Sequence, residues 1–280
     1  MVIRHVVVAS DESPEGYGAL EAAAALAAHG GARLTVLHVA IASEEAMSGT
    51  RVPGTAAPSE RSVQALRQRY PELRADARTA YGIPAIEISR FAEDQRADLL
   101  VLGRKHRSQA TRLLLGDTAD AVVRRSPVCC LLVPQSRHAF ARILVALDGT
   151  ERGLAALYGA MALARLAGGT LRSVLVDPAR RQGALEASVP EPPSARAHRL
   201  EQALEALGRT ADANGLGVSP SALRIRHGDP VAEILNEVGQ NTDVLALGYH
   251  RGGPPSALED GSVSRRLSHV APCAVMTVPL

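Results

Sequence analysis

Two stretches of the sequence combine glycine, small polar residues and a following helix pattern in a way that suits anion binding. In each stretch one glycine ends an apolar run and a second glycine precedes the helix pattern: Gly103 and Gly116, then Gly248 and Gly261. Backbone N–H groups at a helix amino end attract an anion, and glycine lets a phosphate group approach closely. The pattern therefore predicts phosphate binding, although the Asp, Ser or Thr residues that follow would also serve as ordinary helix caps.

An aspartate at the end of a different apolar run precedes each stretch. Asp11 follows IRHVVVAS, and Asp148 follows ILVAL. After each aspartate comes an Ala-rich helix pattern, and the two patterns end at Gly30–Gly31 and Gly168–Gly169, where helix C-caps are expected. The same features thus occur twice, in the same order.

This order shows that the chain is a duplication. Asp11 and Asp148 are 137 residues apart, whereas Gly103 and Gly248 are 145 apart, because the second copy has a longer middle segment. Between them, YGIPAIEI matches HGDPVAEI. Matches that keep their order under one growing offset indicate two copies of one unit. We expect domain 1 at residues 1–135, a linker at 136–140 with Phe140 as its apolar anchor, and domain 2 at 141–280.

Each copy alternates short apolar runs with helix patterns. This alternation predicts an α/β fold with two tandem Rossmann-like domains, each an open five-stranded, mostly parallel sheet with helices on both faces. The expected strands lie near 4–9, 33–39, 73–80, 98–102 and 128–133, then near 142–147, 170–176, 219–227, 243–247 and 273–278. The expected helices lie near 14–29, 59–70, 84–95 and 116–125, then near 151–167, 194–213, 230–240 and 262–270.

Ligands of open α/β sheets bind beyond the carboxyl ends of the strands, where the strand order reverses. The ends of the first and fourth strands should meet this condition in each copy. The candidate segments are therefore 9–11 with 103–118, and 146–150 with 248–264.

Composition argues against several classes of protein. The 280 residues carry a formal net charge of +2, so strong attraction to nucleic acid or to a membrane is not expected. No apolar run reaches the roughly 18 residues of a membrane span, and the amino terminus is too quickly polar for a signal peptide. We therefore expect a cytoplasmic protein. Its three cysteines, Cys129, Cys130 and Cys273, are interpreted as small buried side chains rather than as metal or redox groups.

The glycine stretches and their surroundings resemble the universal stress protein family. The order Gly, two residues, Gly, nine residues, Gly, then Ser or Thr is similar to the ATP motif of that family, and so are LVALDGTE and the closing strand APCAVMTVP. The resemblance covers almost the whole chain, twice. It implies a tandem protein with a role in stress survival, with bound ATP and with Mg²⁺ only where ATP is bound. It also implies pairing of the two domains through their last strands, and leaves a homodimer of whole chains open.

Carried over by position, the resemblance places Asp148 near the adenosine and the Val176 backbone near the base. The other positions surround ribose and phosphates, where Ser262 and Ser264 can add hydroxyl donors. The complete set in domain 2 is Ala146, Asp148, Val176, Gly248, Arg251, Gly261, Ser262, Val263 and Ser264. The set in domain 1 is Asp11, Val39, Gly103, His106, Gly116, Asp117 and Thr118.

Both copies depart from the family pattern at the second glycine, where His106 and Arg251 stand. A side chain there obstructs the approach of phosphate and costs about 1 kcal/mol or more if the position requires a positive φ. Arg251 could compensate by pairing with phosphate, whereas His106 would do so weakly. Asp117 stands where Ser or Thr is expected and repels phosphate, so domain 2 is predicted to be the better site. Three further cations keep the first loop basic: Arg104, Lys105 and Arg107.

Signatures of catalysis are absent from the sequence. It has no GxxxxGK[ST], no GxGxxG after the first strand, no GxSxG and no HExxH. His38 and His227 are interpreted as structural. We therefore expect no enzyme, with at most slow, incidental hydrolysis of ATP. The two classes left open are a nucleotide-binding sensor and an interaction scaffold whose degenerate sites are empty or hold another ligand.

Overall fold

The computed structural model describes residues 1–40, 57–104, 117–135, 140–177, 198, 205, 223–239, 241–249 and 262–280, with only the backbone given at Asp117, Asp177 and Ser262. Of the expected helix at 194–213 it describes His198 and Glu205, both helical, and the rest lies outside these ranges. No helix in the described ranges has the length and apolar character needed to cross a membrane.

Strands and helices alternate as expected from the sequence. Domain 1 contains β1 (His5–Ala9), α1 (Pro14–Gly30), β2 (Arg33–Ala40), α3 (Pro58–Arg69), β3 (Ala75–Tyr81), α4 (Pro84–Asp94), β4 (Leu99–Arg104), α5 (Asp117–Arg125) and β5 (Cys129–Pro134). Domain 2 contains β6 (Arg142–Leu147), α6 (Glu151–Ala167), β7 (Thr170–Asp177), β8 (Leu223–His227), α8 (Pro230–Val238), β9 (Val244–Tyr249), α9 (Ser262–Val270) and β10 (Ala274–Pro279). The α/β prediction is confirmed.

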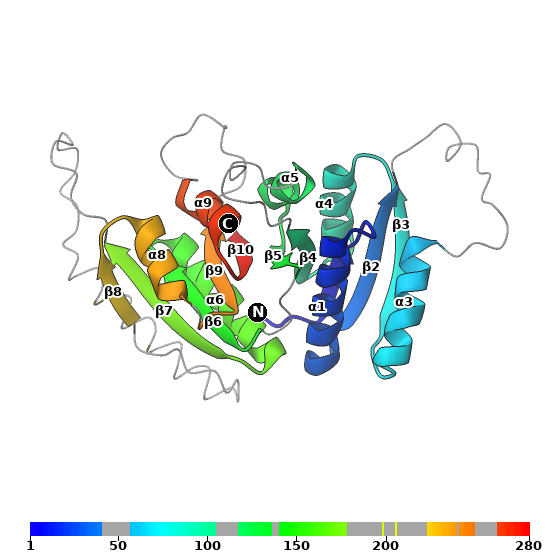
Figure 1. Ribbon diagram of the computed structural model, residues 1–280, viewed down its shortest axis with the longest axis horizontal. Helices are drawn as coiled ribbons and strands as arrows, with labels where there is room; N and C mark the ends of the chain where they lie inside the picture. The colour runs from blue at the N-terminus through cyan, green and yellow to red at the C-terminus, as the bar shows by residue number, and fades with distance from the viewer. Residues whose placement is uncertain are drawn as a thin grey trace.

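The strands form one sheet in the order β3-β2-β1-β4-β5-β10-β9-β6-β7-β8. Neighbours are parallel except β5 and β10, which pair antiparallel with Cys130 opposite Thr277. Figure 1 shows β5 and β10 at the centre of the molecule and β3 and β8 at its two ends. The two open sheets expected from the sequence are therefore halves of one sheet. Read from either outer edge inwards, the two halves have the same topology, so the duplication stands.

Helix caps are as the sequence predicts. Ser13 Oγ accepts a hydrogen bond from Gly16 N at 3.1 Å, and Pro14 takes the first helical position of α1. The same helix is followed by Gly31 with φ +67°, and α6 by Gly168 with φ +61°, a left-handed backbone that favours glycine. Local sequence therefore sets where α1 begins and where both long helices end.

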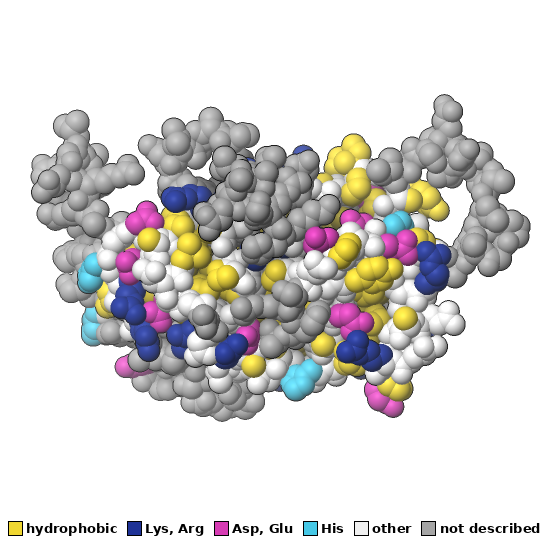
Figure 2. Space-filling model, viewed as in Figure 1, with side chains coloured by type: hydrophobic (Ala, Val, Ile, Leu, Met, Phe, Trp, Pro, Cys, Tyr) yellow, Lys and Arg dark blue, Asp and Glu magenta, His cyan; other side chains and the backbone are white. Residues whose placement is uncertain are grey.

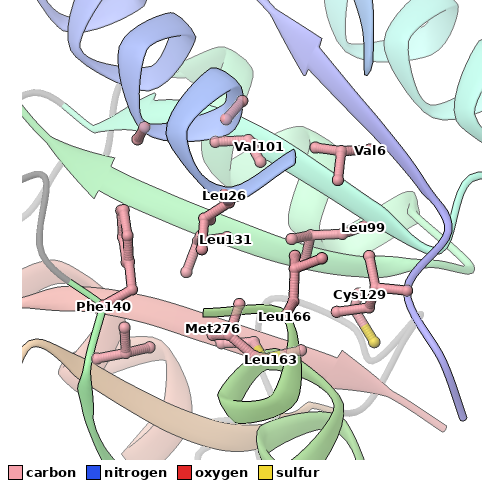
Figure 3. Close-up of a cluster of buried hydrophobic side chains, with 14 of the residues drawn as sticks. Val6, Leu26, Leu99, Val101, Cys129, Leu131, Phe140, Leu163, Leu166 and Met276 are labelled. Carbon is pink, nitrogen blue, oxygen red and sulfur yellow. The ribbon is translucent and has the colours of Figure 1, made fainter. Parts of the chain in front are cut away.

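Helices cover both faces of the sheet. α1 and α6 share one cluster of buried apolar side chains, in which Figure 3 shows Leu26 of α1 and Leu163 of α6 near Met276 of β10. α4, α5, α8 and α9 cover the other face. Phe140, the predicted anchor, is 5% exposed within the first cluster. The apolar core therefore continues from one domain into the other.

The three cysteines are buried thiols, as predicted. Burial raises the pKa of Cys129 to about 11 and the pKa of Cys130 to about 12. Both thiols are therefore protonated at neutral pH and act as small apolar side chains.

Candidate functional site

In each domain the strand order reverses between two neighbouring strands, because the connection after one strand leads to one side of the sheet and the connection after the other leads to the opposite side. β1 lies beside β4, with β2 and β3 on one side and β5 on the other, and β6 lies beside β9 in the same way. This is the switch point at which open α/β sheets bind ligands. Asp11 follows β1 and Gly103 lies near the carboxyl end of β4, while Asp148 and Gly248 hold the matching places at β6 and β9. The structure thus provides two equivalent switch points, one in each domain, and "crevice" denotes the region beside the strand ends at each of them.

In domain 2 the first turn of α6 contacts both the predicted aspartate and the predicted glycine. Asp148 Oδ1 accepts a hydrogen bond from the backbone N–H of Thr150 at 2.9 Å. A Cβ atom on Gly153 would lie 2.8 Å from that same oxygen, and a Cβ atom on Gly248 would lie 2.5 Å from the Arg152 carbonyl oxygen. Asp148 and Gly248 therefore meet at one helical turn, although 100 residues separate them in the sequence.

Domain 1 repeats this arrangement at the first turn of α1. Asp11 Oδ1 accepts a hydrogen bond from the backbone N–H of Ser13 at 3.1 Å. A Cβ atom on Gly16 would lie 2.6 Å from this oxygen, and one on Gly103 would lie 2.6 Å from the Glu15 carbonyl oxygen. In both domains, close packing of a helix on a strand is sufficient to require the strand glycine. From the sequence alone, this role could not be separated from a role in phosphate binding.

The amino end of α9 adds another predicted residue to the crevice of domain 2. Ser264 Oγ donates a hydrogen bond to the carbonyl oxygen of Gly248 at 2.8 Å. The sequence predicted that this hydroxyl donates to a phosphate, and the structure instead directs its hydrogen to the protein backbone, leaving its oxygen able to accept. Domain 1 has Ala119 at the equivalent position, preceded by the exposed Thr118.

Four other predicted residues pack against the apolar core on the α8 side of the sheet. Val39, Ala146 and Val263 are half-buried, and Val176 is 8% exposed. With its side chain buried, Val176 could approach a base through its backbone, as the resemblance implies. The remaining predictions fall outside the described residues: His106, Gly116, Arg251, Gly261 and the side chains of Asp117 and Ser262.

Ser10 lies within the predicted segment 9–11, although the sequence did not single it out as a site residue. Its Oγ is buried and has no hydrogen-bond partner in the part of the chain that the structure describes. A buried hydroxyl without a partner is costly, so this atom suits contact with a ligand at the end of β1. The available signal was a polar residue closing an otherwise apolar run. The Ser10 carbonyl oxygen bonds His38 Nδ1 at 3.0 Å, which confirms His38 as a structural histidine.

Arg104 contradicts the prediction that it adds charge to the first loop. Its side chain is 2% exposed and donates hydrogen bonds to the carbonyl oxygens of Ser268 at 2.8 Å, Ala271 at 2.7 Å and Cys273 at 2.8 Å. Burial lowers the pKa of Arg104 to about 10, so the guanidinium stays charged at neutral pH. Arg104 therefore crosses from domain 1 to the carboxyl end of α9 in domain 2.

Among the residues that the structure describes, the crevices thus offer aspartates, hydroxyls and backbone groups. Across the described ranges, no three His, Cys, Asp or Glu side chains gather so as to hold a metal ion. Such groups are suited to hydrogen bonding with a polar or anionic ligand.

Comparison with known proteins supports the duplication. A model of the universal stress protein family matches residues 3–134 and again residues 139–279. A universal stress protein of Mycobacterium tuberculosis is 26% identical over 195 residues, which is 67% of this chain and 66% of the relative. One from Methanocaldococcus jannaschii is 38% identical over 56 residues, or 20% of this chain and 33% of the relative.

A solved structure has the same fold over the whole chain. The crystal structure of a universal stress protein from Archaeoglobus fulgidus matches with a TM-score of 0.68 at 19% identity, covering 100% of this chain and 99% of that one. Because the family model accounts for both halves in turn, this chain belongs to the universal stress protein family and carries its domain twice.

Proposed function

We propose that this tandem universal stress protein binds an adenine nucleotide such as ATP and acts as a stress-response sensor. The observation that carries the proposal is the convergence of Asp148, Gly248 and the amino end of α9 at the switch point of domain 2. A hydrogen-bonding carboxylate suits ribose hydroxyls, and a helix amino end beside a glycine suits phosphate. Bound ATP would alter the conformation of the loops around the crevice, with Mg²⁺ accompanying its phosphates.

Domain 2 is the stronger of the two proposed sites. Domain 1 offers the same contacts at Asp11 and Gly103, but it has Asp117 where domain 2 has Ser262, and Ala119 where domain 2 has Ser264. A carboxylate at a helix amino end competes with phosphate for the same N–H groups. We therefore propose that domain 1 binds nucleotide more weakly.

We also propose that the protein binds without efficient catalysis. The chemistry of both crevices consists of hydrogen-bonding groups around a helix turn, and hydrolysis of bound ATP would be slow and incidental. The cytoplasmic location expected from the sequence and the absence of nucleic-acid and membrane partners stay predictions.

Hydrogen exchange with and without ATP tests the ranking of the sites. ATP should slow amide exchange in residues 244–249 and 262–270 more than in residues 99–104 and 117–125. Equal protection, or protection confined to domain 1, would contradict the ranking. The substitution Arg251→Gly should tighten ATP binding if the side chain obstructs the site, and weaker binding would identify Arg251 as a phosphate ligand. His106→Gly is the matched control in domain 1.

The alternative function is a scaffold that binds a protein partner without nucleotide. The observation that favours it is that the Ser264 hydroxyl already donates its hydrogen to the Gly248 carbonyl oxygen, and that Gly248 already packs tightly on the first turn of α6. Mass spectrometry of the purified protein after denaturation separates the two functions. Adenine nucleotide that co-purifies supports the sensor, whereas its absence, with no thermal shift on adding ATP and Mg²⁺, supports the scaffold.

A further inference from the structure

A buried arginine beside the crevice of domain 1 links the two domains. Arg104 directly follows Gly103, which packs on the first turn of α1 in the crevice of domain 1. Its guanidinium donates to Ser268 O, Ala271 O and Cys273 O across the domain boundary. In Figure 1, β5 lies next to β10 at the centre of the molecule, and β4 lies on the other side of β5. The end of β4 is therefore tied to the far domain by a cation that water does not reach.

From Ser268 the hydrogen bonds continue along one side of α9. Arg104 Nη1 donates to Ser268 O at 2.8 Å, Ser268 Oγ donates to Ser264 O at 2.8 Å, and Ser264 Oγ donates to Gly248 O at 2.8 Å. The series thus begins at Arg104, next to Gly103 at the end of β4, and ends at Gly248, near the end of β9. We call these four residues, Arg104, Ser268, Ser264 and Gly248, the serine relay.

The serine relay has no mirror image in the other direction. The residues of α5 at the places of Ser264 and Ser268 are Ala119 and Val123, which have no hydroxyl group. The residue at the place of Arg104 is Tyr249. A structural staple between duplicated domains would be expected twice, whereas this one occurs in a single direction.

Several buried groups depend on Arg104 at once. Within the described chain its guanidinium donates to three carbonyl oxygens, and none of these bonds involves a carboxylate. Displacement of the side chain would break all three bonds together inside the protein, which is costly. The place of Arg104 therefore bears on the order of both the end of β4 and the carboxyl end of α9.

We propose that the serine relay couples the two crevices, so that a ligand held at Asp11 and Gly103 raises the affinity of the crevice at Asp148 and Gly248. Because coupling between two binding sites is reciprocal, a ligand in the stronger crevice of domain 2 orders α9, holds Arg104 in its buried position and so orders the end of β4 before domain 1 binds. The second ligand then loses less conformational entropy on binding, which gives positive cooperativity. The predicted cooperativity of ligand binding rests on the proposed function.

Amide hydrogen exchange of the ligand-free chain tests the relay without any nucleotide. Arg104→Met should speed exchange about 10-fold or more in residues 262–274 and also in residues 244–249. Ser268→Ala, a milder change, should speed exchange in residues 244–249 with little effect on residues 99–104. Acceleration that stays within residues 268–274 and does not reach Gly248 in either variant overturns the proposal.

Ser89→Ala is the matched control for Ser268→Ala. Ser89 is also a buried helical serine, and its Oγ donates to Ala85 O at 2.9 Å, four residues earlier in α4. Removal of this hydroxyl costs the same kind of bond outside the relay. It should change exchange in α4 alone, and a Ser89→Ala effect at Gly248 equal to that of Ser268→Ala would show that the response is unspecific and overturn the relay.

Calorimetric titration with ATP then tests the coupling itself. The wild-type chain should bind two ATP molecules with positive cooperativity of about 5-fold, and Ser268→Ala should reduce the cooperativity while both sites still bind. Two independent sites in the wild type would overturn the coupling. If ATP binds to neither domain, the proposed function fails, and the exchange experiment alone decides whether the relay connects the ends of β4 and β9.

Discussion

The two domains hold the same backbone contacts at their crevices but surround them with different side chains. Asp11 and Asp148 each accept a hydrogen bond from the N–H of the residue just before the following helix, and Gly103 and Gly248 each admit the first turn of that helix. The next residue after the glycine, however, is Arg104 in one domain and Tyr249 in the other. Duplicated units can thus differ freely where a side chain points to a neighbour, but not where a Cβ atom would displace a helix.

A second difference lies on the α4 and α8 faces of the domains. Seven residues after the helix-opening proline, domain 1 has the half-buried Phe91, whereas domain 2 has Glu237 with a side chain 3% exposed. Arg172, Arg224 and Arg226 form ion pairs with Glu237 at 3.2, 3.2 and 2.8 Å. Figure 2 shows dark blue side chains gathered at the β8 end of the molecule. Domain 2 therefore has a charged network where domain 1 has an apolar contact.

The largest effect is expected from the residue that follows the strand glycine. Arg104→Ala removes the cation from three carbonyl oxygens and should lower the free energy of unfolding by about 3 kcal/mol or more. Tyr249→Phe, the matched change in domain 2, removes one phenol hydroxyl and should cost about 1 kcal/mol or less. Urea unfolding followed by circular dichroism measures both. Equal losses would show that Arg104 is no more important to the interface than its counterpart.

The charged network gives the next largest effect. Glu237→Leu leaves three guanidinium groups crowded together without their shared carboxylate, and we expect a loss of about 2 kcal/mol. The arginine side chains are 30%, 59% and 45% exposed, so they can turn into water and limit the loss. Phe91→Leu at the equivalent position should cost less than about 1.5 kcal/mol. The difference should shrink at high salt, and a difference that salt leaves unchanged would contradict an ionic origin.

Much of the fold was predictable because its determinants are local. Continuous apolar runs such as VVVA and LLVL identified central strands, and the glycines after α1 and α6 fixed the helix ends. Repetition of this order then predicted the second domain from the first. The union of the two halves into one sheet came from the family resemblance rather than from the residues, because edge pairing leaves no mark in local periodicity.

The candidate site was only partly predictable, because its contacts connect distant segments. Asp11 and Asp148 could be located since each ends an apolar run, but their hydrogen bonds to the residue before the next helix were not foreseen. Arg104 stands in a basic sequence, and only the folded chain reveals that its acceptors lie 164 to 169 residues away. Ser264 was expected to donate to a phosphate from its place at a helix amino end. Its actual acceptor, the Gly248 carbonyl oxygen, lies 16 residues earlier on another element and could not be recognised from the sequence.

Acid should affect the first strand of domain 1 more than that of domain 2. His5 and Arg142 hold equivalent places, and burial, together with Arg33, lowers the pKa of His5. A histidine whose pKa is lower in the folded state contributes stability above its unfolded pKa of about 6.5, and that stability is lost as the pH falls below this value. The urea midpoint should therefore fall between pH 7.5 and pH 5.5, and less so in His5→Gln. Arg142→Gln should keep the full pH dependence, and a loss of it there would contradict the assignment to His5.

The smallest effect is expected directly after the two aspartates, where the backbone is left-handed in both domains. Gly149 has φ +74° and Glu12 has φ +60°, so domain 1 holds a side chain in a conformation that favours glycine. Glu12→Gly should raise the free energy of unfolding by about 0.5 kcal/mol, because relief of strain exceeds the entropy gained by the unfolded chain.

Glu12 also pairs with Arg61 at 2.8 Å, but both side chains are exposed and such pairs contribute about 0–1 kcal/mol. Glu12→Ala removes that pair and keeps the strain, so it should be neutral or slightly destabilising. Gly149→Ala should destabilise domain 2 by about 1 kcal/mol, and a gain from Gly149→Ala would mean that the two turns are not equivalent.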